Sequence, residues 1–261
     1  TVLTVSIGHR VSVALYLIRY QRDRLKAYYL AKAGINRAIF EIEQDDRSVD
    51  ALNDKWANNL DVFKNIVLDD KQSQPYSEFA EVGYSFINSK NGQKETVFGV
   101  IDEERKININ TAPNTLLKQV FILKGYEMDA DSLANTIVDW IDTDLETEPG
   151  KEIFKNQPLK VPEELLSILE YFYEEVKGIV GYQEEAQKAF SAIEDLISVN
   201  GTNININTAS EGVLRIIFYS AVDVLRERSI NVNNDQANSL VSKIVDFRNA
   251  APFDEGLGII N

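Results

Sequence analysis

The sequence contains no cysteine, and this excludes disulfides, thiolate metal sites and a cysteine nucleophile. Its single histidine, His9, disfavours zinc sites and acid–base chemistry that depend on histidine. No apolar stretch reaches the roughly 20 residues of a membrane span, because the apolar opening of the chain stops at His9 and Arg10. The sequence patterns of serine hydrolases, metalloproteases, P-loop proteins and dinucleotide-binding proteins are also missing. We therefore expect no enzyme activity.

Negative charge dominates the chain, but it is unevenly distributed. The 261 residues carry a formal net charge of −14. Residues 1–40 contain seven basic side chains and one acidic side chain, a charge of +6, so the remaining residues carry −20. A body this acidic repels phosphate backbones, and we expect no binding of nucleic acid. Calcium, by contrast, favours carboxylate oxygens.

Residues 1–43 are predicted to form one long helix, because they contain no proline and only two glycines. At 1.5 Å per residue such a helix is roughly 60 Å long. A stripe of small residues recurs along it at steps of three and four: Ala27, Ala31, Gly34 and Ala38. Small side chains allow a sheet of the same chain or a helix of a partner to approach closely. We predict that this stripe contributes to partner binding.

Residues 44–106 are predicted to form a mixed α/β region. A helix is expected over residues 50–67, where four apolar side chains have helical spacing: Trp56, Leu60, Phe63 and Val67. Residues 79–87 and 96–102 are rich in aromatic and β-branched side chains, which is typical of strands. Asn91-Gly92 lies between them and predicts an antiparallel hairpin.

Residues 107–261 are predicted to form a helical domain that contains a duplicated unit, over residues 107–175 and 204–261. The hexapeptide Ile-Asn-Ile-Asn-Thr-Ala occurs at residues 107–112 and again at 204–209, and we refer to it as the INTA motif. A second matched segment follows each copy, at residues 133–140 and 240–247. Each copy therefore reads as a short extended piece that leads into two helices.

The helix starts after the INTA motifs carry recognisable signals. In the second copy, Thr208 and Glu211 have the spacing of a capping box. In the first copy, Pro113 falls in the opening turn of the helix, where its missing N–H costs little.

Four segments in this order resemble K-type minor pseudopilins of type II secretion systems, the GspK family. They are residues 19–42, RYQRDRLKAYYLAKAGINRAIFEI; residues 100–117, VIDEERKININTAPNTLL; residues 137–150, IVDWIDTDLETEPG; and residues 203–214, NININTASEGVL. The resemblance implies an α+β, pilin-like fold: a long N-terminal helix on a small antiparallel sheet, with a large inserted helical domain. The sequence departs from the family pattern at both ends, where the prepilin peptidase site, most of the membrane helix and the closing strands are not evident.

The resemblance also implies a role and a location. The role is that of a structural subunit at the tip of the pseudopilus, supporting protein secretion across the outer membrane. The expected partners are the I- and J-type minor pseudopilins and the major pseudopilin. The body is expected in the periplasm, anchored in the bacterial inner membrane by an apolar segment upstream of Thr1.

An acidic segment at residues 139–152 is a candidate calcium site. It carries six carboxylates, at Asp139, Asp142, Asp144, Glu146, Glu148 and Glu152, but not the spacing of an EF-hand. The residues alone favour a solvated acidic loop, because charge runs are usually solvated. The resemblance implies calcium in the inserted domain, and the candidate ligands of a Ca²⁺ ion are Asp139, Asp142, Asp144, Glu146 and Glu152.

Three alternatives remain open at this point. A minor subunit of a type IV pilus would share the same features. The INTA motif with its helix pair also resembles the helix-hairpin-helix DNA-binding module of the bacterial competence receptor, although the predicted hairpins lack its glycine-rich sequence. Finally, the aromatic clusters at residues 28–29 and 171–173 fit either a core or a partner contact, and helical periodicity favours the core.

Overall fold

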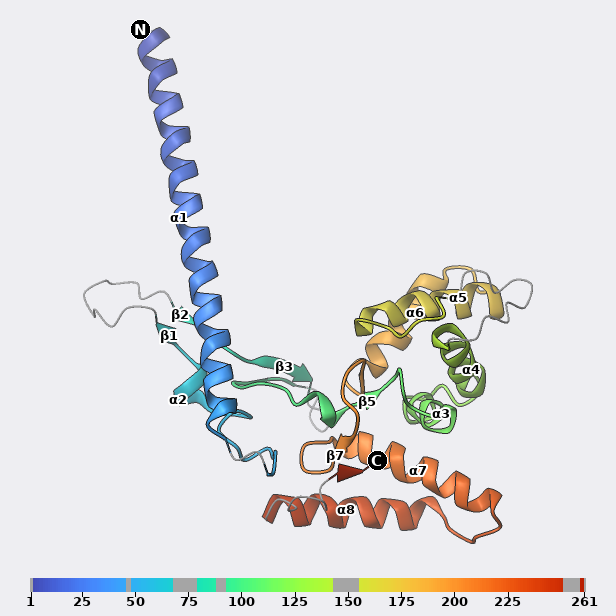
Figure 1. The fold of residues 1–261 in the computed structure, drawn as a ribbon. Helices are drawn as coiled ribbons and strands as arrows, with labels where there is room; N and C mark the ends of the chain where they lie inside the picture. The colour runs from blue at the N-terminus through green and yellow to red at the C-terminus, as the bar shows by residue number, and fades with distance from the viewer. Residues whose placement is uncertain are drawn as a thin grey trace. The chain divides into compact units, whose positions relative to one another are not determined.

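The computed structural model describes residues 2–45, 48–67, 79–87, 93–142, 155–250 and 259–260 (Figure 1). The chain divides into two compact units. The first comprises Thr1–Arg47 and Leu52–Ile101, and the second comprises Ser48–Ala51 and Asp102–Asn261. The first unit holds the long helix and two antiparallel strand pairs, and the second is mainly helical, so the α+β class is confirmed. The division at Ile101 lies a few residues before the predicted start of the helical domain at Ile107.

Helix α1 runs from Val2 to Glu43, as predicted, and it is 42 residues long (Figure 1). From Ser6 onward, the buried residues of α1 all lie in its C-terminal third, at steps of four, four and three: Leu30, Gly34, Ala38 and Glu41. This part of α1 contacts β1, β2 and α2 of the same unit. A Cβ atom placed on Gly34 would lie 3.0 Å from Cγ2 of Val82, so the small residue allows the close approach.

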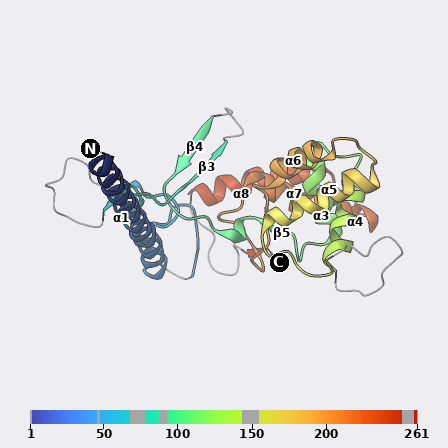
Figure 2. The same ribbon diagram turned by 90° about the horizontal axis from the view of Figure 1, so that it is seen from above.

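Two antiparallel strand pairs accompany α1. Strand β1 (Ile66–Val67) pairs with β2 (Phe79–Ala80), and β3 (Tyr84–Ile87) pairs with β4 (Lys94–Val97). Figure 2 shows β3 and β4 side by side. The predicted strand over 79–87 is therefore two strands that pair with different partners. The hairpin is confirmed, and its predicted turn at Asn91-Gly92 lies outside the described residues.

The helix predicted over residues 50–67 is wrong. Only one turn of helix forms there, α2 (Leu60–Phe63), and the side chain of Asn59 caps it by accepting from Val62 N at 3.2 Å. The backbone before α2 is used differently: Asn59 N donates to Phe98 O at 2.7 Å, and Trp56 O accepts from Val100 N at 2.9 Å.

These long-range hydrogen bonds replace the helical ones that the apolar spacing suggested. Trp56 and Phe63 are buried, while Leu60 and Val67 are exposed. Gly99 permits the approach, because a Cβ atom there would lie 2.3 Å from the carbonyl oxygen of Ala57.

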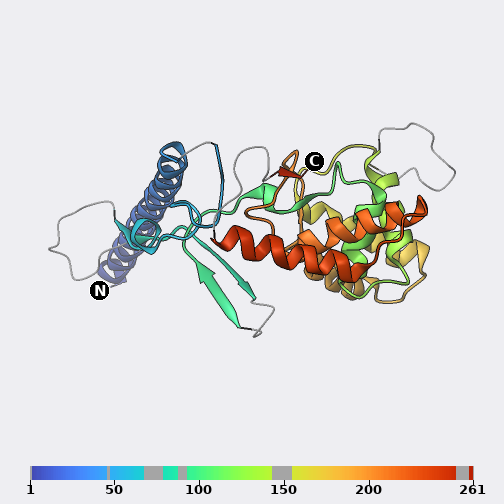
Figure 3. The ribbon, with the colours of Figure 1, turned by 90° about the horizontal axis from the view of Figure 1, so that it is seen from below.

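The second unit is built from helices and two-residue strands around one core. Its elements before the second INTA motif are η1 (Glu103–Arg105), β5 (Ile107–Asn108), α3 (Asn114–Leu123), α4 (Ala130–Ile141), η2 (Pro162–Glu164), α5 (Leu165–Tyr171), η3 (Phe172–Val176), α6 (Tyr182–Ile193) and β6 (Ile197–Ser198). The others are β7 (Ile204–Asn205), α7 (Glu211–Glu227), α8 (Asn234–Ala250) and β8 (Ile259–Ile260). Helix α3 packs on α4 and α7, and α7 packs on α8, the red helix in Figure 3. Each predicted copy thus contains a short strand and a helix pair.

The two INTA motifs adopt the same local turn. In the first, Asn110 N donates to Oδ1 of Asn108 at 3.0 Å, and in the second Asn207 N donates to Oδ1 of Asn205 at 2.9 Å. Such Asx turns let the asparagine side chain replace a backbone partner where the extended piece ends. The strands differ in pairing: β5 is parallel to β6, whereas β7 is antiparallel to β8. The two copies therefore share the same turn but differ in how their strands pair.

The predicted capping role of Thr208 is wrong. Ser210 caps α7, since its Oγ accepts from Val213 N at 3.2 Å. The hydroxyl of Thr208 donates instead to Oδ2 of Asp102 at 2.5 Å, and Asn205 Nδ2 donates to the same oxygen at 3.2 Å. Asp102 thus attaches the start of the second unit to the second INTA motif.

Candidate functional site

The exposed part of α1 is an accessible apolar surface of the first unit. Every side chain from Ser6 to Tyr29 is exposed. The large apolar ones among them are at least 44% exposed: Ile7, Val11, Val13, Leu15, Tyr16, Leu17, Ile18, Tyr20, Leu25, Tyr28 and Tyr29. Apolar groups gathered in this way mark interaction surfaces, because water solvates them poorly.

The predicted small-residue stripe is shared between two environments. Gly34 and Ala38 are buried within the first unit, while Ala27 and Ala31 are exposed. Packing against the chain's own strands, which the sequence left open, therefore covers the second half of the stripe. Partner binding at Ala27 and Ala31 stays a prediction.

Basic residues are interspersed with the apolar ones on α1. Arg22 pairs with its neighbour Asp23 at 2.9 Å on the exposed part. Near the C-terminal end, Arg37 pairs with Glu41 at 2.9 Å, and the side chain of Glu41 is 8% exposed. The pair gives this buried carboxylate the partner that it needs. The exposed length of α1 thus presents apolar and cationic groups together.

The aromatic clusters separate into one core and one surface pair. Phe172 and Tyr173 are buried in the second unit, so the core interpretation is confirmed for the second cluster. Tyr28 and Tyr29 are 61% and 51% exposed, and their rings meet edge to face with centroids 5.5 Å apart. The tyrosines of α1 therefore remain available to a partner, as residue types that are enriched in interfaces.

Two of the candidate calcium ligands lie in the described part of the chain. Asp139 is in the last turn of α4 and Asp142 is its C-terminal cap, and both are half-buried. The negative end of the helix dipole lies at this terminus, where a bound cation would be stabilising. The other candidates, Asp144, Glu146 and Glu152, lie outside the described residues, and so does Glu148. Calcium binding stays a prediction.

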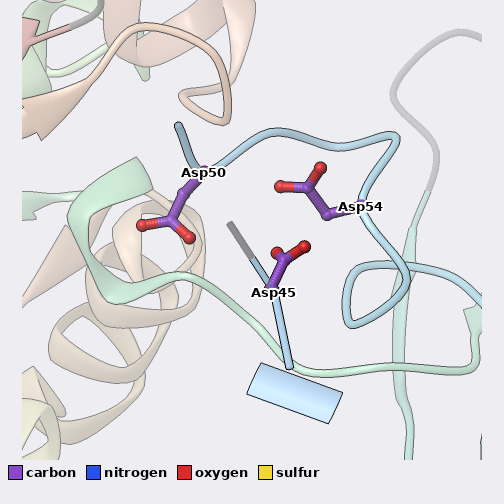
Figure 4. Close-up of side chains that lie close together, drawn as sticks. All are labelled: Asp45, Asp50 and Asp54. Atoms are coloured by element: carbon purple, nitrogen blue, oxygen red, sulfur yellow. The ribbon is translucent and has the colours of Figure 1, made fainter. Parts of the chain in front are cut away.

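Three further carboxylates follow α1 and were not singled out by the sequence: Asp45, Asp50 and Asp54 (Figure 4). Asp45 and Asp54 belong to the first unit, and their carboxylate oxygens lie within 4.8 Å of one another. Asp50 belongs to the second unit, where its backbone carbonyl accepts from Asn205 Nδ2 at 2.9 Å. Two carboxylates fall short of the six to eight oxygens that calcium takes.

Arg248 anchors the second INTA motif from α8. Its guanidinium donates to the carbonyl oxygens of Ile206 and Ala209, both at 2.6 Å. Burial lowers the pKa of Arg248 below its usual range. The first motif is anchored differently: the side chain of Asn110 donates to the carbonyl of Leu159 at 2.9 Å and accepts from the backbone N–H of Leu159 at 2.8 Å. Both motifs are thus structural supports of the helix pairs.

The turn between α3 and α4 is where a helix-hairpin-helix module would meet phosphate. Gly125 in this turn has a φ of 88°. The lysines near it pair with carboxylates: Lys124 with Asp195 at 3.1 Å, and Lys177 with Asp129 at 2.6 Å. Cationic groups that already have partners contribute less to phosphate binding.

Comparisons with known proteins give one solved structure to report. No protein-family model matches the chain, and no curated protein matches it. The structure is similar to a chain of the crystal structure of the GspK–GspI–GspJ complex from the type 2 secretion system of enterotoxigenic Escherichia coli. The TM-score is 0.46 and the identity 16%, over 80% of this chain and 70% of that chain. Among the described helices, none combines the length and the apolar character that a membrane crossing requires.

Proposed function

We propose that this chain is a structural subunit of a pseudopilus, a K-type minor pseudopilin of a type II secretion system. The observation that carries the proposal is the division of α1. Its C-terminal third packs on the chain's own strands, while residues 6–29 are exposed throughout. A helix that is apolar and exposed over so many turns needs neighbours, because water alone stabilises it poorly. The four sequence segments that resemble the GspK family support the same role.

In this role α1 joins the chain to its neighbours. Burying a large apolar side chain contributes about 1.5–3 kcal/mol, and eleven such side chains lie exposed between Ile7 and Tyr29. The proposed neighbours are the I- and J-type minor pseudopilins at the tip and the major pseudopilin below. The second unit, with its own core, would lie in the periplasm, and the anchor in the inner membrane would precede Thr1.

A reconstitution experiment tests the assembly. The full-length protein, co-expressed with the I- and J-type subunits of its own system, is expected to be recovered with both after affinity purification in the presence of calcium. A variant that lacks residues 6–29 should lose them and keep the melting temperature of the second unit. Failure of the full-length protein to recover either subunit would contradict the proposal.

A deletion strain tests the biological role. Loss of the gene is expected to reduce the secretion of proteins across the outer membrane, and the wild-type gene should restore it. A strain that secretes normally but loses surface pili would instead show a minor subunit of a type IV pilus, which the exposed helix would equally serve.

A further inference from the structure

Two turns of the second unit lie side by side. The first, residues 124–129, joins α3 to α4, and the second, residues 176–181, leads from η3 into α6. Nζ of Lys177 in the second turn donates to Oδ1 of Asp129 in the first at 2.6 Å. We refer to these two segments together as the turn pair.

The turn pair holds three apolar side chains in water. Met128 is 99% exposed, Val180 is fully exposed and Val176 is 50% exposed. After Met128 and Val180, the most exposed large apolar side chain among the described residues of the second unit is Phe247, at 57%. Apolar groups this exposed are candidates for partner contacts, and a methionine adapts its shape to different surfaces.

The backbone of the turn pair is held by its own hydrogen bonds. In the first turn the N–H of Tyr126 donates to the carbonyl of Phe121 at 3.0 Å, and in the second the N–H of Ile179 donates to the carbonyl of Tyr173 at 2.9 Å. Gly181 has a φ of 81°, which a larger residue would disfavour, and it lets the second turn enter α6. An ordered backbone therefore presents the apolar side chains, so a partner binds without the cost of ordering these turns.

Negative charge surrounds the apolar side chains. Residues 124–131 and 174–188 contain seven carboxylates and three lysines, a charge of −4. Each lysine already pairs with a carboxylate: Lys124 with Asp195 at 3.1 Å, Lys177 with Asp129 at 2.6 Å and Lys188 with Glu185 at 3.0 Å. The surface around the turn pair is thus electronegative.

A tyrosine in the first turn of α6 responds to this charge. Partial burial raises the pKa of Tyr182 above its usual range, and the carboxylates of Glu174, Glu170 and Glu175 raise it further. Nearby anions oppose the formation of a tyrosinate, whereas they would stabilise a cation. A partner that brings positive charge to this surface would therefore be attracted.

The charge decides which partners fit. Phosphate backbones and anionic lipid are repelled. The turn pair of a second copy is repelled too, because it carries the same charge. Lys or Arg side chains of another protein would be attracted to the carboxylates, while apolar side chains beside them pack on Met128 and Val180.

We propose that the turn pair binds a segment of another protein that carries Lys or Arg beside exposed apolar side chains. The apolar contacts contribute affinity, and the carboxylates select the sign of the partner's charge. The inference goes beyond the proposed function, because it concerns the second unit and not the assembly through α1. Failure to recover the I- and J-type subunits would leave it intact.

Photo-crosslinking in cells tests the surface. Benzoylphenylalanine is introduced into the full-length protein at Met128 or Val180, in its native strain. The matched controls are Leu240 and Phe247, apolar side chains on α8 that are 44% and 57% exposed. The turn-pair positions are expected to give one crosslinked protein, with a yield at least fivefold above the controls. Mass spectrometry should find more Lys and Arg than Asp and Glu in the crosslinked peptide.

Three results of this experiment would overturn the inference. The first is the absence of a crosslink from the turn-pair positions. The second is an equal yield from these positions and from the α8 controls. The third is a crosslink chiefly to an acidic peptide, to lipid or to the turn pair of a second copy.

Charge reversal tests the chemistry of the partner. With the photo-crosslinker at Met128, Glu127→Lys with Glu175→Lys is expected to lower the crosslinked yield at least fivefold. Glu163→Lys with Asp246→Lys makes the same change of charge outside the turn pair, and the yield should stay within twofold. All four carboxylates belong to exposed residues, so both variants should keep the wild-type melting temperature. Equal yields in the two variants would contradict the proposed charge of the partner and overturn the inference.

Discussion

At the scale of single residues, two tyrosines of the second unit allow a comparison of how a hydroxyl group affects stability with and without a hydrogen-bond partner. Tyr173 is 3% exposed, and its hydroxyl has no hydrogen-bond partner among the described residues. Tyr219 donates its hydroxyl proton to Oδ1 of Asn238 at 2.7 Å, and this bond joins α7 to α8. A buried polar group without a partner destabilises the fold, whereas a formed hydrogen bond stabilises it.

The Tyr173→Phe variant removes an unpartnered hydroxyl. Its free energy of unfolding is therefore expected to equal that of the wild type or to exceed it by up to about 1 kcal/mol. In Tyr219→Phe the free energy of unfolding should fall by about 1 kcal/mol, because the variant lacks the donor of this hydrogen bond. Urea denaturation at neutral pH measures both. A loss of more than 1 kcal/mol in Tyr173→Phe would show that its hydroxyl has a partner after all.

Tyr173 is also expected to make the stability of the protein depend on pH. Burial raises the pKa of Tyr173, with nearby Tyr126, Asp129 and Glu185 acting in the same direction. A raised pKa means that its contribution to stability is complete below the ordinary value of about 10 and declines as the pH rises above it. Wild type should therefore lose stability relative to Tyr173→Phe above about pH 10. Parallel alkaline melting curves of the two proteins would contradict this expectation.

At the scale of secondary-structure elements, the packing of α1 on the strands depends on a glycine. A larger side chain at Gly34 would meet Cγ2 of Val82, which lies 3.0 Å from the Cβ position. Gly34→Val is expected to cost roughly 2 kcal/mol through overpacking. Ala31→Val, one turn away on an exposed position, should change stability by less than about 0.5 kcal/mol. Thermal melting of both variants measures the difference, and equal effects would mean that the contact is not maintained.

The sequence predicted the elements whose signals are local. Helix α1 follows from an uninterrupted run without proline, and the β3–β4 hairpin follows from its strand composition and turn. The helix expected over residues 50–67 failed because Trp56 and Asn59 make backbone hydrogen bonds to the segment around Phe98 and Val100. Partners so distant in sequence leave no periodic trace.

The candidate surface, too, could be predicted only in part from the sequence. The stripe of small residues was visible in the sequence, but only the fold shows that Gly34 and Ala38 are covered and that Ala27 and Ala31 are exposed. Thr208 was expected to cap α7, yet Asp102 captures its hydroxyl. Its partner lies more than a hundred residues earlier, so local spacing could not reveal it.

Calcium binding at the acidic segment, residues 139–152, is a prediction that thermal melting can test. If calcium binds there, its addition should raise the melting temperature, and a concentration a hundredfold above the dissociation constant adds about 2.7 kcal/mol. Asp142→Asn with Asp144→Asn should abolish the rise. Asp246→Asn, at the equivalent repeat position of Asp139, is the control and should retain it. The prediction fails if chelator and calcium give the same melting curve.

At the scale of the whole molecule, the two units have separate cores of different size. Large apolar side chains are buried in the first unit at Leu30, Trp56 and Phe63. The second unit buries many more around one contiguous cluster. Stability rises with buried apolar area, so the first unit should melt at a lower temperature.

Calorimetry is expected to resolve two transitions, because proteins with two cores need not unfold in one step. The Gly34→Val variant should lower only the first transition, and Tyr219→Phe should lower only the second. One transition that moves with either variant would show that the units unfold together.

The parallel pairing of β5 with β6 has a consequence for the order of events during synthesis. Ile107 pairs with Ile197, so the first INTA motif cannot complete its backbone hydrogen bonds until the ribosome has delivered the chain beyond β6. Until then β5 lacks its strand partner β6, and α3 lacks the helix α7 that packs on it. Contacts between residues so far apart in sequence form late and slowly. The second unit therefore emerges with its apolar faces open, and this nascent state is the one most exposed to aggregation.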